Sequence, residues 1–452
     1  MKNFALHGGK DWRMNQKPSH RNSAKNRAFC RRSQNGFFQN DIRTKFEQSR
    51  SSFFSLISLT VALTFACSEP EQSAVRGVSE TEIVIGAYGP QTGPAAPYGA
   101  VVRGVECAFK MVNEDGGIAG RKVRVILRDD GYQPARTKAV VKEMVERDGV
   151  FMVMGGVGTA CGMAVKDYLI EQKTPFLFPS SGSPMFAFPP NRYVFSGVPP
   201  YCDEAAILTQ HAVETLGKTK VGIIYQNDDF GKTGLVGAQL ELEQHGAELV
   251  EAVSVEVMDS DLSSHALKLK DAGAEAVLLY VINKHAAILL SESAKIGFSP
   301  TWLASVPLSN MPLMHEITSG RWEDVIFATY YELPDSKHPR VQKYRTARDK
   351  FMPEERWDSM FMAGFVFTNI IVDAIEQCGE ELTQERFVDA LETVKNKEAL
   401  GVKVTFNGAQ RQGHRSVKLI KCTSREGYEQ LTDFVTSDID INEAMRRLRG
   451  RD

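Results

Sequence analysis

Two adjacent carboxylates, Asp129 and Asp130, end an apolar β run at 123–128 and are well placed for chemistry. Such a pair at a strand end can transfer protons or bind a divalent cation. No His or Cys cluster lies near them in the sequence, and no GxSxG, HExxH or Walker motif occurs. We therefore expect no enzyme activity, no metal and no cofactor.

A second group of polar residues follows the β run at 150–154. It is the loop Gly155-Gly156-Val157-Gly158-Thr159, and Pro179-Ser180-Ser181 comes twenty residues later. Hydroxyls and backbone N–H groups at the start of a helix favour an anion, because the helix dipole is positive there. The glycines do not form GxGxxG and no acidic residue follows at the required distance, so dinucleotide binding has weak support.

Alternating strands and helices must position these loops. β runs at 83–87, 123–128 and 150–154 are separated by two helices, and the first helix places Val101, Val105, Phe109 and Val112 on one stripe. This order predicts parallel strands, and open parallel sheets bind ligands beyond the carboxyl ends of their strands.

The same alternation begins afresh after a proline-rich segment at 193–200, which suggests a passage into a second lobe. β runs at 221–225, 249–255, 276–281 and 302–304 are separated by helices that end near 245 and span 262–272 and 284–296. The chain is expected to return to the first lobe near 325–329 and to cross a third time near 402–406, before a strand at 417–421. Three passages of the chain between the two lobes are expected to form a hinge.

The ordered set of motifs resembles the type I periplasmic binding proteins of the leucine/isoleucine/valine-binding family, the receptors of ABC importers. The resemblance covers about Glu82 to Leu431 and rests on these motifs: Thr92-Gly93-Pro94, Tyr98-Gly99, Asn113 to Gly120, the loop 155–159 and Pro179-Ser180-Ser181. It implies two doubly wound α/β lobes joined by a three-strand hinge. It also implies that Asp129-Asp130 cap the following turn and helix.

The resemblance also implies a set of ligand-binding positions. Tyr98, Thr159, Ser180, Ser181 and Gly182 match the first-lobe positions that hold the ligand's carboxylate, while Phe230, Asn283 and the pair Ser305-Val306 match the second lobe. Ser180 and Ser181 suit helix capping equally well, and Phe230 suits a core position under its loop.

The second lobe departs from the pattern of amino-acid-binding members. Those proteins have a tyrosine at the position of Phe230, an aromatic residue near Asn283 and an acid near Val306 that pairs with the ligand's ammonium. An ammonium in a closed cleft without a counter-charge is costly. Asp228 or Asp229 could supply the charge, although acidic loop residues more often form turns. We expect a small organic or aromatic acid, or an amino-acid-like ligand, with its apolar body between Tyr98 and Phe230.

Charge is distributed unevenly along the 452 residues. Residues 1–66 contain 12 of the 54 Lys and Arg but 3 of the 56 Asp and Glu, so the remainder contains 42 basic and 53 acidic residues. An acidic body gives a nucleic-acid role no electrostatic support. The length and the 42% hydrophobic content predict a globular protein with two domains.

The basic leader ends in an apolar segment, Phe53 to Cys67, that is typical of a secretory signal. Leu63-Thr64-Phe65-Ala66-Cys67 resembles a lipobox, which predicts lipidation of Cys67 and a lipid-anchored protein in the periplasm or at the outer face of the cytoplasmic membrane. An ordinary cleaved signal or a buried apolar segment are the alternatives. Residues 1–42 do not resemble a signal, which suggests that the true start lies within the printed sequence.

Five cysteines follow Cys67, without CxxC or Cys/His ligand spacing, so a zinc site is not expected. The odd number leaves at least one free thiol. Cys161, beside the glycine loop, is interpreted as a small packing residue.

The sequence therefore predicts a monomeric substrate-binding protein that presents a small ligand to ABC permease subunits. A ligand sensor with the same fold, signalling to a membrane receptor or regulator, is the alternative. The expected ranges are 1–67 for leader and signal, 68–81 for a tether, 82–198 with 328–402 for lobe 1, 199–327 with 403–431 for lobe 2, and 432–452 for a C-terminal tail.

Overall fold

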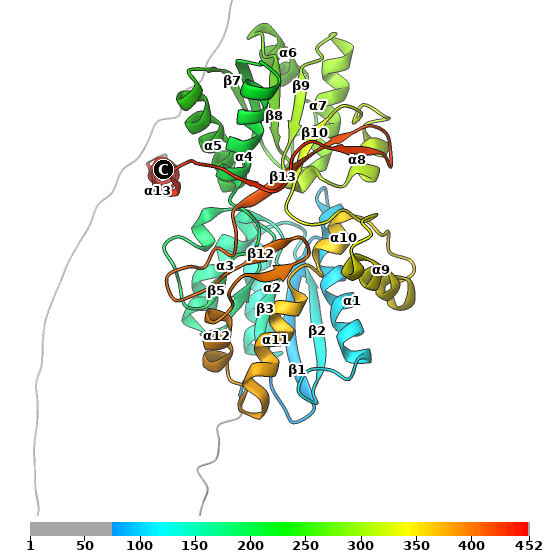
Figure 1. Ribbon diagram of the computed structural model, residues 1–452, viewed down its shortest axis with the longest axis vertical. Helices are drawn as coiled ribbons and strands as arrows, with labels where there is room; N and C mark the ends of the chain where they lie inside the picture. Colours follow the sequence, from blue (N-terminus) through cyan, green and yellow to red (C-terminus); the bar gives the residue numbers. More distant parts are fainter. Residues whose placement is uncertain (1–74, 451–452) are drawn as a thin grey trace, which may run out of the picture. The chain divides into compact units, whose positions relative to one another are not determined.

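A computed structural model describes residues 75–450. The leader and Cys67 lie outside this range. Five parallel strands form the first sheet, in the order β2-β1-β3-β4-β5 (Figure 1). The β runs expected near 83, 123 and 150 are confirmed. The strands are β1 (Glu82–Gly89), β2 (Lys122–Asp129), β3 (Met152–Met154), β4 (Phe176–Leu177) and β5 (Val194–Phe195).

Side chains of β1 alternate between two apolar layers, as the pleat of a strand requires. Val84 and Tyr88 pack with residues of α2 and α3. Ile83 and Ile85 pack in the other cluster, which includes residues of α1, α11 and α12. The first sheet is therefore covered on both faces. The helices are α1 (Ala100–Glu114), α2 (Pro134–Glu146), α3 (Thr159–Glu171), α9 (Pro339–Phe351), α10 (Ser359–Ala363), α11 (Thr368–Cys378) and α12 (Gln384–Glu392).

The second sheet has the order β14-β13-β10-β9-β8-β6-β7, and β15 pairs with β13. Its strands β7, β6, β8, β9 and β10 are parallel, but β13 and β14 are antiparallel to their neighbours. The strands are β6 (Lys220–Gln226), β7 (Glu248–Val255), β8 (Ala276–Tyr280), β9 (Thr301–Ala304), β10 (Ile326–Thr329), β13 (Ser416–Cys422), β14 (Tyr428–Gln430) and β15 (Val435–Thr436). The predicted doubly wound α/β lobe is confirmed, and its parallel sheet has an antiparallel edge because β13 arrives from the first lobe and runs against β10.

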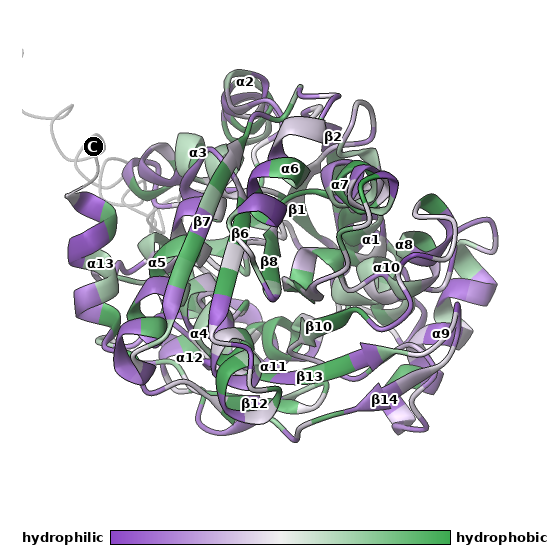
Figure 2. Cartoon of the chain, turned by 90° about the horizontal axis from the view of Figure 1, so that it is seen from above, coloured by the Kyte–Doolittle hydropathy of each residue, from purple (hydrophilic) through white to green (hydrophobic). Residues whose placement is uncertain are grey.

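Six helices accompany the second sheet: α4 (Tyr201–Gln210), α5 (Asp229–His245), α6 (Ser263–Asp271), α7 (Asn283–Lys295), α8 (Met311–Ile317) and α13 (Ile441–Arg449). Figure 2 shows most of β8 as hydrophobic, and every residue of this strand is buried. The loop between β6 and α5 is short. Asp228 caps α5, because its side chain accepts hydrogen bonds from the backbone N–H groups of Phe230 and Gly231.

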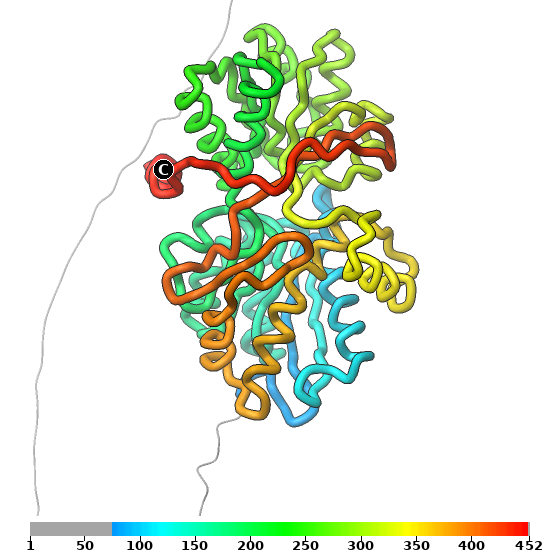
Figure 3. Tube along the Cα trace, in the orientation of Figure 1, coloured from blue at the N-terminus to red at the C-terminus, as the bar shows by residue number. Residues whose placement is uncertain are grey.

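The chain passes between the two sheets three times (Figure 3). The first passage follows β5, the second follows β10, and the third leads from the hairpin of β11 (Lys397–Ala399) and β12 (Val402–Val404) to β13. The first and third run side by side, since Ser196 N donates to Arg411 O at 2.8 Å and Gly413 N donates to Ser196 O at 2.9 Å.

Two passages lie later in the sequence than expected. The run near 325–329 is strand β10 of the second sheet, and the run near 402–406 contains β12 of the hairpin. A short apolar run suits a sheet strand as well as a hinge strand, so the sequence pattern did not separate them. The residue ranges of the two lobes stay a prediction.

The segment expected as a C-terminal tail contains β15 and α13. Ala444, Met445 and Leu448 of α13 are buried against Val236 and Leu240 of α5. Separately, the stretch Ser359–Glu381 is apolar and long enough to cross a membrane, but 72% of its 18-residue apolar window is buried within the described chain, as in the core helix of a soluble protein.

Candidate functional site

Two adjoining cavities of about 60 and 40 Å³ lie where loops from both sheets meet. Their walls come from the carboxyl ends of β1, β3, β6, β8 and β9, the edge at which open parallel sheets bind ligands. Both cavities share Tyr98, Val157, Ser180, Tyr201 and Pro307. Among the described residues that line them, none is Asp, Glu, Lys, Arg or His.

Thr159 lines the smaller cavity as the first residue of α3. Gly158 before it has φ +97°, a conformation that favours glycine and turns the loop into the helix. The hydroxyl of Thr159 lies 2.7 Å from Ser181 Oγ, and Ser181 Oγ accepts a hydrogen bond from Ser183 N. The first N–H groups of a helix have no partner within the helix, so this corner can receive an anion.

Ser180, Ser181 and Gly182 occupy different places around this corner. Ser180 lines both cavities, whereas Ser181 is fully buried behind Thr159. Gly182 accepts a hydrogen bond from Tyr201 N at 2.7 Å, and a Cβ at this position would lie 2.3 Å from Pro199 O. Gly182 therefore allows the first passage to approach the anion corner closely.

Phe230 lines the smaller cavity from the start of α5. Its ring centroid lies 4.8 Å from that of Tyr201 and 5.8 Å from that of Tyr280. Asp228 caps the same helix, and burial raises its pKa to about 6 despite hydrogen bonds from Gln226 and from two backbone N–H groups. Phe230 therefore packs against neighbouring aromatic rings and lines the cavity as well.

Asn283 contacts Tyr98 directly. The hydroxyl of Tyr98 donates to Asn283 Oδ1 at 2.8 Å, and Asn283 N donates to the same hydroxyl oxygen at 3.2 Å. Tyr98 precedes α1 beside the first sheet, while Asn283 begins α7 beside the second. The pair therefore joins the two lobes across the site.

Val306 lines the larger cavity and donates its backbone N–H to Glu204 Oε1 at 3.0 Å. Glu204 is fully buried on α4 and also accepts from Tyr280 OH at 3.0 Å. Burial raises its pKa to about 8, although both hydrogen bonds oppose the shift. The second lobe therefore has a buried acid, Glu204, that contacts the backbone of Val306 without lining the cavity. This acid was not predicted from the sequence.

The Asp129-Asp130 pair shapes loops, as expected. Asp129 accepts from Gln91 N at 2.8 Å and from Thr92 Oγ1 at 2.7 Å. Burial alone would raise its pKa, but hydrogen bonds from these residues and Gly131, together with Arg136, lower it to about 2. Asp130 accepts from Tyr132 N and from Thr137 Oγ1.

Several cavity residues were absent from the sequence prediction. Tyr132 follows the Asp pair and packs on Gly158, where an added Cβ would lie 2.5 Å from its ring. An unusual φ of +60° at Tyr132 directs this loop. Val157 and Gly158 belong to the glycine loop 155–159, which the sequence indicated only as a loop, and the other positions had no signal beyond aromatic residues near loops. The residues missed are Val101, Tyr132, Val157, Gly158, Val198, Tyr201, Ile282, Pro307, Tyr330, Tyr331, Met360 and Ala363.

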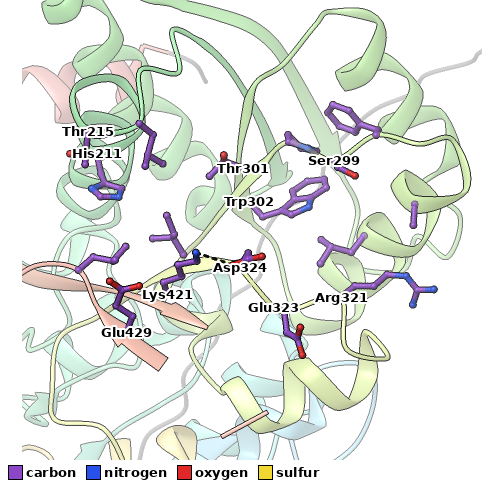
Figure 4. Close-up of a pocket in the computed structure, with 17 residues that line it drawn as sticks. His211, Thr215, Ser299, Thr301, Trp302, Arg321, Glu323, Asp324, Lys421 and Glu429 are labelled. Carbon is purple, nitrogen blue, oxygen red and sulfur yellow. Dashed lines mark ion pairs between the residues drawn. The ribbon is translucent and has the colours of Figure 1, made fainter. Parts of the chain in front are cut away.

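A third cavity, of about 650 Å³, lies at the opposite end of the second sheet (Figure 4). It is lined by residues at the start of β9, before β10 and near the end of β13, including Trp302, Glu323 and Lys421. Lys421 Nζ pairs with Asp324 Oδ1 at 2.9 Å. None of the eight predicted binding residues lines it, and it lies at the amino ends of the parallel strands. The smaller cavities are therefore the better candidate site.

The match to known proteins identifies the family. The family model described as periplasmic binding protein matches residues 82–427. This chain belongs to that family. The resemblance to the type I leucine/isoleucine/valine-binding proteins is confirmed, and the family implies a periplasmic location.

This periplasmic binding protein is 29% identical over 231 residues to a Leu/Ile/Val-binding protein homolog from Brucella melitensis, a match that covers 51% of this chain and 62% of that relative. A branched-chain amino acid ABC transporter structure from Thermus thermophilus with bound valine aligns with a TM-score of 0.74 at 19% identity, over 82% of this chain and all of that one. A fatty acid ABC transporter substrate-binding protein from Thermomonospora curvata aligns with a TM-score of 0.74 at 22% identity, over 80% of this chain and 95% of that one. Both structures establish the fold of this binding protein.

The described part of this binding protein contains no group of three or more His, Cys, Asp or Glu that could hold a metal. Its five described cysteines are free thiols, and four of them are buried: Cys107, Cys161, Cys202 and Cys422. Burial raises the pKa of the Cys161 thiol to about 12. A thiol that stays protonated is a packing group, which agrees with the interpretation of Cys161 from the sequence.

Proposed function

We propose that this protein is the extracytoplasmic solute-binding component of an ABC importer and captures a small carboxylate-bearing ligand by hinge closure. The observation that supports this proposal is the contact of Tyr98 with Asn283 beside cavities that both lobes line. A ligand enclosed there would be removed from water without any covalent step, and the closed form would be the one that the permease recognises.

The carboxylate is proposed to bind at the start of α3. Thr159 Oγ1 and the first N–H groups of that helix supply donors, and no acidic residue among the described ones lines either cavity. The small cavity volumes favour a compact ligand over a long acyl chain. The proposed ligand-binding set is Tyr98, Thr159, Ser180, Ser181, Gly182, Phe230, Asn283 and Val306.

Purified protein tests this proposal through thermal unfolding with a panel of small organic acids, aromatic acids, amino acids and amides. A ligand that binds only the folded state stabilises it by RT ln(1 + [L]/Kd), so a hit raises the Tm in a concentration-dependent way. Thr159→Val keeps the side-chain shape and removes the hydroxyl, and we expect it to reduce the shift. Absence of stabilisation by every member of the panel would contradict the proposal.

We further propose that the mature protein is a monomer anchored by lipid at Cys67. Incorporation of labelled palmitate into the wild-type protein, and its loss in Cys67→Ala, would support the anchor. Equal labelling of the two proteins, or no labelling of either, would argue for another means of retention.

A further inference from the structure

Four aromatic residues line the smaller cavity, and they come from four separate segments. Tyr98 precedes α1, Tyr132 follows β2, Tyr201 begins α4 and Phe230 lies near the start of α5. Tyr201 and Phe230 are in ring contact at 4.8 Å, with a tilt of 60° between their planes. Aromatic side chains from both lobes thus surround one compact space.

Two acids lie behind this aromatic lining. Asp228 accepts from Phe230 N at 3.0 Å, and Glu204 accepts from Val306 N at 3.0 Å. Neither carboxylate lines the cavities. Burial raises the pKa of Glu204 to about 8, so this acid is mostly neutral at pH 7, whereas Asp228, with a pKa of about 6, is mostly ionised. The second-lobe side of the cavity therefore has one buried negative charge, that of Asp228, beside the backbone of Phe230.

This arrangement discriminates between kinds of cation. A primary ammonium has three N–H donors, and burying them without acceptors is costly. No carboxylate among the described lining residues can accept from it. A quaternary ammonium has no N–H group and is attracted to aromatic faces within about 6 Å, which is how aromatic cages recognise methylated amines.

The other side of the same cavity suits a carboxylate. Thr159 begins α3 there, where the helix dipole is positive. The cavity therefore combines a corner for an anion with an aromatic corner for a cation that forms no hydrogen bonds. A compact zwitterion satisfies both.

We propose that the ligand is a betaine, a carboxylate with a quaternary ammonium, whose methylated head is held by Tyr132, Tyr201 and Phe230 and whose carboxylate is held at Thr159. This inference rests on the proposed function and names the ligand class for the same site. It also gives the departures at Phe230 and Val306 a common reason, since a methylated head needs an aromatic surface and no hydrogen-bonding acid.

Isothermal titration of the full chain with glycine betaine and with 3,3-dimethylbutanoate tests the charge directly. The two molecules have the same shape, and a carbon replaces the charged nitrogen in the second. We expect glycine betaine to bind about tenfold more tightly, the ratio that corresponds to a cation–π contribution of ordinary size. Equal or tighter binding of 3,3-dimethylbutanoate, or no binding of glycine betaine, would overturn the inference.

The aromatic ring is tested by a matched pair of variants. Tyr132→Leu removes the ring, and Tyr132→Phe keeps it without the hydroxyl. We expect the ratio of the two affinities to fall towards one in Tyr132→Leu and to persist in Tyr132→Phe. Phe230→Leu serves as a second ring variant if Tyr132→Leu does not fold. A ratio that is unchanged in every correctly folded ring variant would overturn the assignment.

Failure of this inference can be distinguished from failure of the proposed function. If benzoate or 3,3-dimethylbutanoate stabilises the protein and glycine betaine does not, the binding function stands and the betaine assignment fails. If no acid of any kind binds, both fail.

Discussion

The hydroxyl of Tyr98 and the side chain of Asn283 meet across the site at 2.8 Å, although 185 residues separate them in the chain. Asn283 N also donates to the same hydroxyl oxygen, so one phenol satisfies two groups of α7. Because the partners belong to different lobes, opening the hinge must break both hydrogen bonds.

Tyr98→Phe is expected to shift the ligand-free protein towards an open arrangement. Each lost hydrogen bond reduces the stability of the closed form relative to the open form by about 1 kcal/mol. This changes the ratio of closed to open molecules about fivefold for each bond. Small-angle X-ray scattering would report an increased radius of gyration. Tyr193→Phe is the matched control, because its hydroxyl donates to Glu385 on the first-lobe helix α12. An equal increase in both variants would contradict the assignment of Tyr98 to closure.

Arg415→Met is expected to destabilise the protein strongly. Arg415, in the third passage, donates to fully buried Asp203 through Nε at 2.7 Å and Nη2 at 2.5 Å. Removing one partner leaves a buried charge uncompensated, at a cost of about 3 kcal/mol or more. Urea denaturation would measure the free energy of unfolding.

Arg124→Met is the control for that experiment, because its pair with Glu82 is exposed and such pairs contribute about 0–1 kcal/mol. The double variant Asp203→Leu/Arg415→Met should recover part of the loss, since it removes both charges. Similar losses for Arg124→Met and Arg415→Met would refute the role of burial.

Glu204→Gln is expected to flatten the dependence of stability on pH. The folded-state pKa of Glu204 is raised by burial from 4.5 to about 8. Ionising it therefore opposes folding, and stability falls as pH rises from about 4.5 to about 8. Between pH 6.5 and 8 this fall should be about 2 kcal/mol, since one pKa unit corresponds to about 1.4 kcal/mol.

That pH window separates Glu204 from Asp228, whose pKa is raised to about 6. Asp228→Asn should therefore keep the wild-type slope above pH 6.5, while Glu204→Gln should lose it. Denaturation in urea at four pH values would supply both slopes. A wild-type slope in Glu204→Gln would show that another group titrates.

Gly104→Ala is expected to disturb the packing of α1 on α10. A Cβ at Gly104 would lie 2.0 Å from Phe361 O, a backbone atom that has little freedom to move. Such overpacking costs about 1–3 kcal/mol. At Gly408 the nearest heavy atom would be 3.9 Å away, so Gly408→Ala should change stability by less than about 0.5 kcal/mol. Comparable urea midpoints for the two variants would contradict the close approach.

Elements with local sequence signals could be predicted before the structure was known. The apolar stripe of Val101, Val105, Phe109 and Val112 identified α1, because helix periodicity is set by neighbouring residues. The order of these elements was enough to predict two α/β lobes. Tyr98, Thr159 and Ser180 were found through motifs that stand at the ends of strands.

The grouping of distant residues into one environment became visible in the folded chain. Glu204 reaches Val306 across 102 residues, and nothing in the run around Glu204 distinguishes it from an exposed helical acid. Tyr132 lines the cavity because its ring packs against Gly158. Helix α13 belongs to the folded core because Leu448 is buried against α5. These contacts depend on how the two sheets and the three passages pack together. The burial of a side chain, and therefore its protonation state, follows from that packing, and sequence periodicity does not encode it.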